Sequence, residues 1–315
     1  MITLFSIPKA FQGHNGIIQR NAIRSWTLLQ PQSEVILLAD DEGTDQIAAE
    51  LGVMHIPDVE RNEFGTPLLD DAYRLAESEA THPLLCYVNA DIILMSDLIK
   101  AVETVKANSD WFLMTGQRRD LEVEHLLDFG GDWEERLRKD VSKRGRLHHF
   151  TGIDFWAYSK GLLSDMPPLA VGRIAFESWC LYKARAAKAD VVDSTEIVYS
   201  IHQEHDYYHH PGGLRGIGEG VEAQRNREMV GGGRYFFIIK DRTHILSTKG
   251  LKRSLDGWRL WRGLRTATVL YPSAPLPVRL VVGFTNAGID FGISFAKWLG
   301  VRRPYKLNID STDEK

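Results

Sequence analysis

The stretch "LLCYVNADIIL", residues 84–94, decides the fold class of this chain. Its first five residues are almost all apolar, and polar side chains enter at Asn89 and Asp91. An apolar run without alternation is typical of a strand buried on both faces, as in a parallel sheet covered by helices. Such sheets bind ligands beyond the carboxyl ends of their strands. Asn89 and Asp91 are therefore predicted to lie at a binding site.

The same pattern extends through the first half of the chain, where short apolar runs alternate with helical patterns. The apolar runs include residues 2–7, 34–40 and 84–94, and the helical patterns include residues 17–29, 68–78 and 98–107. This alternation predicts an α/β fold with a mostly parallel sheet that is flanked by helices.

The composition is that of an ordinary globular protein. The 315 residues carry a formal net charge of −4, so no general attraction to nucleic acid is expected. The two cysteines, Cys86 and Cys180, lie in apolar segments and indicate no disulfide framework. The segment "MITLFSIPKAF" lacks the basic region and the long apolar run of a signal peptide. We therefore expect a cytoplasmic protein.

Five motifs together resemble the GT-A-type glycosyltransferases, and in particular the bacterial nucleotide-diphospho-sugar transferases. They are "NAIRSW" (21–26), "YVNADIIL" (87–94), "FTGIDFWAY" (150–158), "GRIAFESW" (172–179) and "SIHQEHDYYHHPGG" (200–213). The resemblance covers roughly the first three quarters of the chain. It implies a GT-A-like, Rossmann-type catalytic domain in residues 1–245. The implied reaction moves a sugar from a nucleotide-diphosphate-sugar donor to a hydroxyl acceptor, either a glycan or a lipid-linked compound.

The resemblance also implies a divalent metal, Mn²⁺ or Mg²⁺, on the donor diphosphate. The family holds this metal with an Asp-any-Asp triplet, but the first position of the triplet is Asn89 here. The chain therefore offers one carboxylate less, and Asn89→Asp is expected to preserve activity or to tighten metal binding. Asp91 is the predicted first ligand, and His202 or His205 is predicted to supply the ligand that the family takes from a downstream histidine. The alternative is that these histidines only hydrogen-bond neighbouring strands.

Other polar residues are candidates for binding the nucleotide. Ile7 and Pro8 follow the first apolar run and are predicted to contact the base, with Asn89 nearby. Asp40 or Asp41 is predicted to accept hydrogen bonds from the base or the ribose, although "DDEG" is also typical of a polar turn. The predicted diphosphate ligands are Arg173 and Arg215, because a guanidinium binds phosphate oxygens in pairs.

Two acids are candidates for catalysis. Glu177 is the predicted base that takes the proton of the acceptor hydroxyl, and Asp154 is predicted to bind hydroxyls of the sugar or the acceptor. Relatives usually carry Asp-Asn-Trp where this chain has Glu177, Ser178 and Trp179, so the carboxylate is kept with a longer reach. The alternative is that Glu177 only stabilises the first turn of a helix.

Other functional classes also fit parts of the pattern. A nucleotidyltransferase uses a similar sheet, but "SIPKAFQGHNG" is a poor match to its glycine-rich phosphate loop. A metallohydrolase could use the histidine cluster from His202 to His210, and it would bind metal tightly without a nucleotide. A carbohydrate-binding protein without catalysis is a further alternative. It would release no nucleoside diphosphate from a donor.

Residues 246–315 are predicted to form an amphipathic, helical C-terminal extension. Leu251, Leu255 and Trp258 recur at helical spacing among basic residues, and the later apolar runs are too short to span a bilayer. The extension is expected to pack on the catalytic domain, to form a homo-oligomer, or to contact the inner face of a membrane peripherally.

Overall fold

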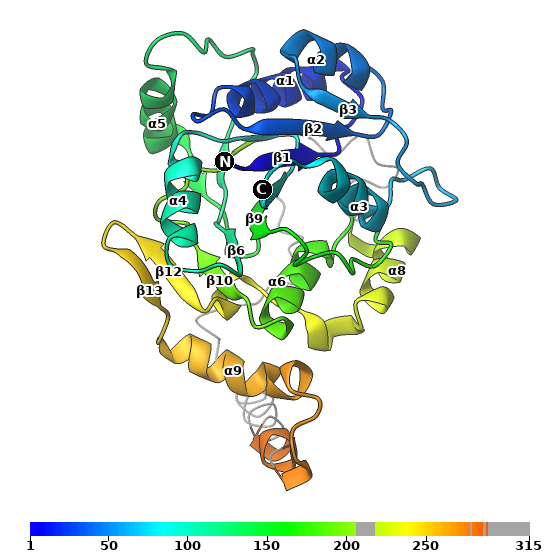
Figure 1. Cartoon of the computed structure of the whole chain (residues 1–315), viewed down its shortest axis with the longest axis vertical. Coiled ribbons are helices and arrows are strands. Elements are labelled where there is room, and N and C mark those ends of the chain that lie inside the picture. The colour runs from blue at the N-terminus through cyan, green and yellow to red at the C-terminus, as the bar shows by residue number, and fades with distance from the viewer. Residues whose placement is uncertain (206–217, 278, 286–287, 289–315) are drawn as a thin grey trace, which may run out of the picture. The chain divides into compact units, whose positions relative to one another are not determined.

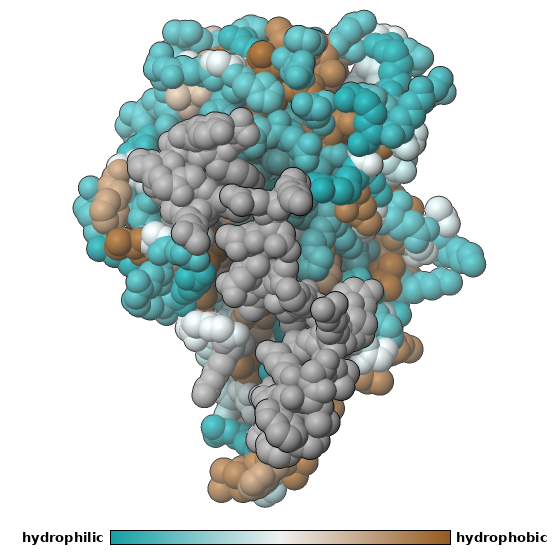
Figure 2. Space-filling model, turned by 180° about the vertical axis from the view of Figure 1, so that it is seen from behind, coloured by the Kyte–Doolittle hydropathy of each residue, from teal (hydrophilic) through white to brown (hydrophobic). Residues whose placement is uncertain are grey.

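The computed structural model describes residues 1–205, 218–277, 279–285 and 288 of the 315. The chain separates into two compact units, Met1–Arg259 and Leu260–Lys315, called unit 1 and unit 2 below. The view in Figure 2 shows a largely polar surface on unit 1 and apolar atoms gathered on the described part of unit 2.

The centre of unit 1 is a mixed sheet with nine strands among the described residues. Its order is β13-β12-β10-β6-β9-β4-β1-β2-β3. The strands are β1 (Thr3–Ser6), β2 (Glu34–Leu38), β3 (Met54–Ile56), β4 (Leu84–Val88), β6 (Phe112–Thr115), β9 (Phe155–Ser159), β10 (Asp190–Asp193), β12 (His244–Ser247) and β13 (Gly250–Arg253). Five of the neighbouring pairs are parallel, while β9 runs antiparallel to both of its neighbours and β13 is antiparallel to β12. Figure 1 shows β3, β2 and β1 side by side. The predicted α/β class with a mostly parallel sheet is confirmed.

Helices cover both faces of this sheet. The helices are α1 (Gly13–Thr27), α2 (Thr44–Leu51), α3 (Leu69–Glu79), α4 (Asp97–Lys106), α6 (Phe176–Ala186) and α8 (Val221–Met229), and the short 3₁₀ turns are η1 (Gly232–Tyr235) and η2 (Ile239–Asp241). A further helix, α5 (Trp133–Arg144), packs instead on a second, smaller sheet. Because side chains alternate along a strand, Cys86 on β4 points to one face and Tyr87 to the other.

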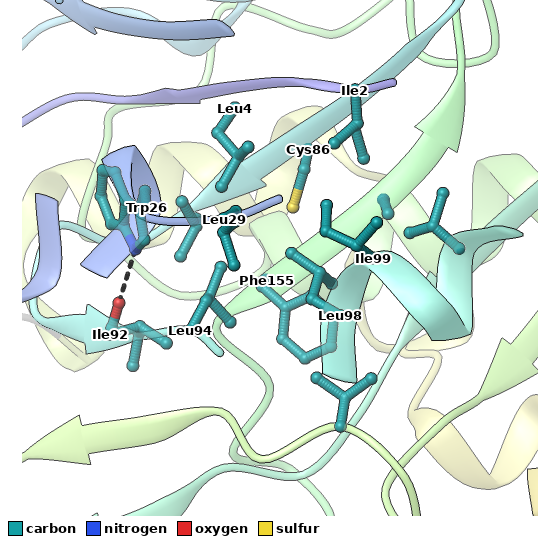
Figure 3. Packing of buried hydrophobic residues seen from close by; sticks show 14 of the residues in the cluster. Ile2, Leu4, Trp26, Leu29, Cys86, Ile92, Leu94, Leu98, Ile99 and Phe155 are labelled. Carbon is teal, nitrogen blue, oxygen red and sulfur yellow. Dashed lines mark hydrogen bonds between the residues drawn. The ribbon is translucent and has the colours of Figure 1, made fainter. Parts of the chain in front are cut away.

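The Cys86 face packs against α1, α2 and α4. Figure 3 shows Leu4 and Cys86 from the sheet together with Trp26 from α1 and Leu98 from α4, all fully buried. The indole N–H of Trp26 donates to the carbonyl of Ile92 at 2.9 Å, so this large side chain leaves no unpaired donor in the core. The apolar core therefore fixes α1 against the segment that follows β4.

The opposite face is aromatic and packs against α3 and α6. Tyr87 of β4 stacks on Trp156 of β9 with ring centroids 5.1 Å apart, and Phe176 at the start of α6 meets both rings edge-on. Tyr73 of α3 accepts a hydrogen bond from the Trp156 indole at 2.6 Å. Offset and edge-on contacts of this kind add to the burial of the rings. They fix the start of α6, and with it Glu177.

A second, smaller sheet lies beside the carboxyl ends of the main strands. Its order is β5-β11-β7-β8, formed by β5 (Ile92–Ile93), β11 (Ile201–Gln203), β7 (Arg119–Leu121) and β8 (Arg146–Leu147). In its register, His202 on β11 pairs with Ile92 on one side and with Asp120 on the other. Segments more than 100 residues apart in sequence are thereby brought together.

The predicted C-terminal helix differs from the structure at its start. Residues 250–253, which include Leu251, form strand β13, because they pair with β12 at the edge of the main sheet. The helix α9 begins later and spans Gly257–Leu270. The helical spacing of Leu251, Leu255 and Trp258 is therefore not used, and residues 246–259 belong to unit 1.

Candidate active site

Seven strands of the main sheet run in the same direction and end at the same edge, and β9 begins there because it runs the opposite way. The antiparallel register places Val88 opposite Phe155, so Asn89 and Asp154 are neighbours just beyond the strands. The backbone N–H of Asn89 donates to the carbonyl of Asp154 at 2.9 Å, and its side-chain amide donates to Asp154 Oδ1 at 2.7 Å. Asn89 therefore holds a carboxylate as its hydrogen-bond partner.

The small sheet brings the three predicted metal ligands together. Gln203 binds the carbonyl of Asp91 through its backbone N–H and its side-chain amide, at 3.3 and 3.0 Å, so β11 fixes Asp91. Asp91 Oδ2 then lies 3.0 Å from His205 Nε2 and 3.7 Å from His202 Nε2. One ligand atom from each of the three residues lies within 4.8 Å of the others.

The residues present fit a divalent cation. Asp91 Oδ1 is buried and makes no hydrogen bond to any described residue, although a buried carboxylate oxygen ordinarily has a partner. Burial alone would raise the pKa of Asp91, but the His205 hydrogen bond and the charges of His202 and Lys9 hold that pKa well below its usual range. The carboxylate is therefore ionised. Two imidazole nitrogens and a carboxylate suit Mn²⁺ in particular, since Mg²⁺ prefers oxygen ligands alone.

Arg118, Asp120 and His148 form a charged network next to these ligands that the sequence analysis missed. Arg118 donates from Nε to Asp120 Oδ1 at 2.9 Å, and its Nη1 lies 3.1 Å from Asp154 Oδ2. His148 Nδ1 lies 2.7 Å from Asp120 Oδ2. The segment "TGQRRD" follows strand β6 just as "NAD" follows β4, so the same carboxyl-end rule identifies Arg118 and Asp120.

Glu177 lies in the first turn of α6, as the sequence predicts for its alternative role. Ala175, which precedes this helix, adopts a left-handed φ of 85°, an uncommon conformation for a residue with a side chain. The strain suggests that the start of α6 is set by its surroundings, chiefly by the aromatic packing of Phe176. The pKa of Glu177 is raised to about 7, chiefly by burial and also by the nearby Asp154 carboxylate, while a backbone hydrogen bond and the charge of Arg118 oppose the rise. A carboxyl group with this pKa exchanges protons near neutral pH.

The segment after β1 is held in place by α1. Gln19, a buried side chain of α1, accepts a hydrogen bond from the backbone N–H of Lys9 at 2.7 Å and donates to its carbonyl at 2.9 Å. This fixes the buried Ile7 and Pro8 at the carboxyl end of β1, where the sequence predicts nucleotide contacts. The Lys9 ammonium acts electrostatically on Asp91, and it is a further charged residue that the sequence pattern did not reveal.

Three other candidate nucleotide-binding residues form ion pairs with side chains of the protein. Asp40 and Asp41 both bind Arg61, at 2.5 and 3.0 Å, which is the behaviour of a polar turn. Arg173 binds Glu222 of α8 at 2.7 Å. These contacts compete with the nucleotide roles predicted for them. Arg215 and the part of the histidine cluster that follows His205, up to His210, lie outside the described residues.

Sequence comparisons identify no relative of this chain. No protein-family model matches it, and no curated protein matches it.

Solved structures give matches with low sequence identity. S. aureus TarS 1–349 in complex with UDP-GlcNAc is 13% identical with a TM-score of 0.43, and the match covers 67% of this chain and 61% of TarS. Glucosyl-3-phosphoglycerate synthase from Mycobacterium tuberculosis, in complex with Mn²⁺, UDP and phosphoglyceric acid, is 14% identical with a TM-score of 0.43. That match covers 74% of this chain and 79% of the synthase. The chain spans less than two thirds of the TarS structure that it matches.

Proposed function

We propose that this chain is a metal-assisted GT-A-type glycosyltransferase that uses a nucleotide-diphosphate-sugar donor. One observation carries the proposal: Asp91, His202 and His205 cluster just beyond β4, and Asp154, which lies beyond the same strand end, acts electrostatically on the buried carboxyl group of Glu177. Arg118 connects the two groups, because it binds both Asp154, which acts on Glu177, and Asp120, which lies 3.4 Å from His202. A cation site next to a titratable carboxyl group is what sugar transfer to a hydroxyl requires.

Each residue then has a defined role in the reaction. A divalent cation held by Asp91, His202 and His205 would neutralise charge on the departing nucleoside diphosphate. Glu177, in its ionised form, accepts the proton of the acceptor hydroxyl while that oxygen bonds to the anomeric carbon and the bond to the diphosphate breaks. Asp154 is a poor candidate for this base, since Asn89 and Arg118 already donate hydrogen bonds to its carboxylate. We assign Asp154 to the positioning of Arg118 instead.

Binding of Mn²⁺ in the presence of UDP tests this function. We expect UDP to tighten Mn²⁺ binding by the wild-type protein, and His205→Ala to weaken binding of the Mn²⁺–UDP pair by at least ~10-fold, since a nitrogen ligand is lost. Calorimetric titration measures both effects. His125→Ala is the matched control, because its side chain is 89% exposed.

The same titration separates the alternatives. If His205→Ala binds the Mn²⁺–UDP pair as tightly as the wild type does, the histidines have only a structural role. Tight Mn²⁺ binding without UDP would favour the metallohydrolase. Release of nucleoside diphosphate from UDP-sugars, measured in parallel, excludes a binding protein without catalysis.

We further propose that unit 2 contacts an anionic lipid surface, which would suit a lipid-linked acceptor. Leu276, Leu280 and Phe284 recur every four residues in a helical segment and are 66, 50 and 74% exposed. Between residues 260 and 285 the sequence contains three arginines and no acidic residue, so its charge complements anionic headgroups. No helix in the described parts of the chain is long and apolar enough to cross a bilayer.

Co-sedimentation with vesicles containing phosphatidylserine tests this contact. We expect the full-length protein to bind at low salt and to dissociate as the salt concentration rises, because screening weakens the attraction of arginine to lipid. The double variant Leu280→Ser and Phe284→Ser should bind more weakly, whereas Leu126→Ser, at a 62% exposed leucine of unit 1, should not. A wild-type protein that stays in the supernatant at low salt would rule out the lipid contact and leave packing or oligomer formation.

A further inference from the structure

His202 lies between two carboxylates. Its Nε2 lies 3.7 Å from Asp91 Oδ2, and its Nδ1 lies 3.4 Å from Asp120 Oδ1. The parallel pairing of β7 and β11 makes Asp120 and His202 register partners, so their side chains lie on the same face of the small sheet. Only one of the two carboxylates, Asp91, belongs to the candidate metal ligands.

The carboxylate of Asp120 is held in place by other side chains. Its two oxygens face Arg118 Nε at 2.9 Å, His148 Nδ1 at 2.7 Å and Arg146 at 3.2 Å. The residue is 4% exposed. A buried carboxylate with three partners keeps its orientation, so it can in turn orient a further side chain.

The two ring nitrogens of His202 differ in protonation when its imidazole is neutral. A neutral imidazole carries one N–H and one lone pair. The lone pair must be on Nε2 if His202 binds a cation together with Asp91, and the N–H is then on Nδ1. Nδ1 is buried, and the distance to Asp120 is longer than a normal hydrogen bond. A cation on Nε2 makes the N–H on Nδ1 a stronger donor. We therefore expect the distance from Nδ1 to Asp120 Oδ1 to shorten when the cation binds.

We propose that Asp120 is a positioning residue that accepts the Nδ1–H of His202 and thereby aims the Nε2 lone pair at the cation. This inference rests on the proposed function, because it assigns a role within the same metal site. Partners of this kind fix the ring and its tautomer, and their loss typically weakens metal binding about 10- to 100-fold.

Mn²⁺ titration of the full-length protein with UDP, followed by electron paramagnetic resonance, tests the role of Asp120. We expect Asp120→Ala to weaken Mn²⁺ binding about 10- to 100-fold, and Asp120→Asn to recover part of this loss because it keeps an acceptor oxygen. Asp110→Ala is the matched control: it removes an aspartate that is 94% exposed and pairs with Lys106 outside this network, and it should change the affinity little.

The tautomer of His202 is a second measurement that needs no Asp120 variant. Nitrogen NMR of histidine-labelled wild-type protein with UDP and Zn²⁺, a diamagnetic cation that binds imidazole nitrogen, should show the proton on Nδ1, with the resonance assigned by its loss in His202→Ala. A proton on Nε2, or wild-type Mn²⁺ affinity in folded Asp120→Ala, would overturn the role of Asp120 alone. Failure of the wild-type protein to bind Mn²⁺ with UDP would instead overturn the proposed function.

Discussion

Asp91→Asn is expected to lower the rate of sugar transfer at least ~10²-fold while the protein stays folded. The amide is nearly the same size as the carboxylate but carries no charge, so the cation site loses its only carboxylate among Asp91, His202 and His205. The fold should survive, since Asp91 is held through its backbone carbonyl by Gln203, a contact that the substitution keeps. The measurement is release of nucleoside diphosphate in the presence of acceptor, with the melting temperature recorded for each variant.

A matched control tests whether this loss is specific. Asp45 is an exposed aspartate in the first turn of α2, and Asp45→Asn should keep wild-type activity. Wild-type turnover in Asp91→Asn would remove Asp91 from the metal site. A large drop in its melting temperature would show instead that the carboxylate mainly supports the fold through His205.

Part of the main sheet was predictable because several of its strands are buried apolar runs. β1, β2 and β4 each keep nearly every residue buried, which produces the unbroken pattern seen in the sequence. The small sheet was not predictable, since β5 and β8 contain two residues each and β7 and β11 three. Strands this short have no measurable periodicity. Their pairing depends on contacts between segments far apart in the chain.

The candidate site was predicted to the extent that its residues follow long strands or belong to family motifs. Asp91 and His202 come from such motifs, whereas Asp120 is on a short strand of the small sheet, and its pairing with His202 follows only from the register. The hydrogen bond from Asn89 to Asp154 could likewise not be predicted from the sequence. A carboxylate at position 89 would face Asp154 across this 2.7 Å contact, so we no longer expect Asn89→Asp to preserve activity.

Glu177→Gln is expected to lower the turnover number by about 10²- to 10⁴-fold, the usual contribution of a positioned base. The pH profile gives an independent measure, because the wild-type base must be ionised to accept the proton. With the Glu177 pKa raised by burial to about 7, the wild-type rate should rise through pH 7 and level off above it. The residual rate of Glu177→Gln should lack this rise.

The stability of the same variant separates catalysis from helix capping. The pKa of Glu177 is about 7 in the folded protein, above its usual value of 4.5, so burial favours the protonated form. The stability that this residue contributes is therefore present below pH 4.5 and is lost as the pH rises to about 7. At pH 8, the melting temperature of Glu177→Gln should be no lower than that of the wild type. If Glu177 is the base, Glu177→Gln should be inactive but stable. If Glu177 only caps the helix, Glu177→Gln should be active but less stable, because a carboxylate at a helix start favours the folded state. Glu177→Asp, which restores the residue usual in relatives, should retain more activity than Glu177→Gln, and equal activity in the two variants would remove Glu177 from the reaction.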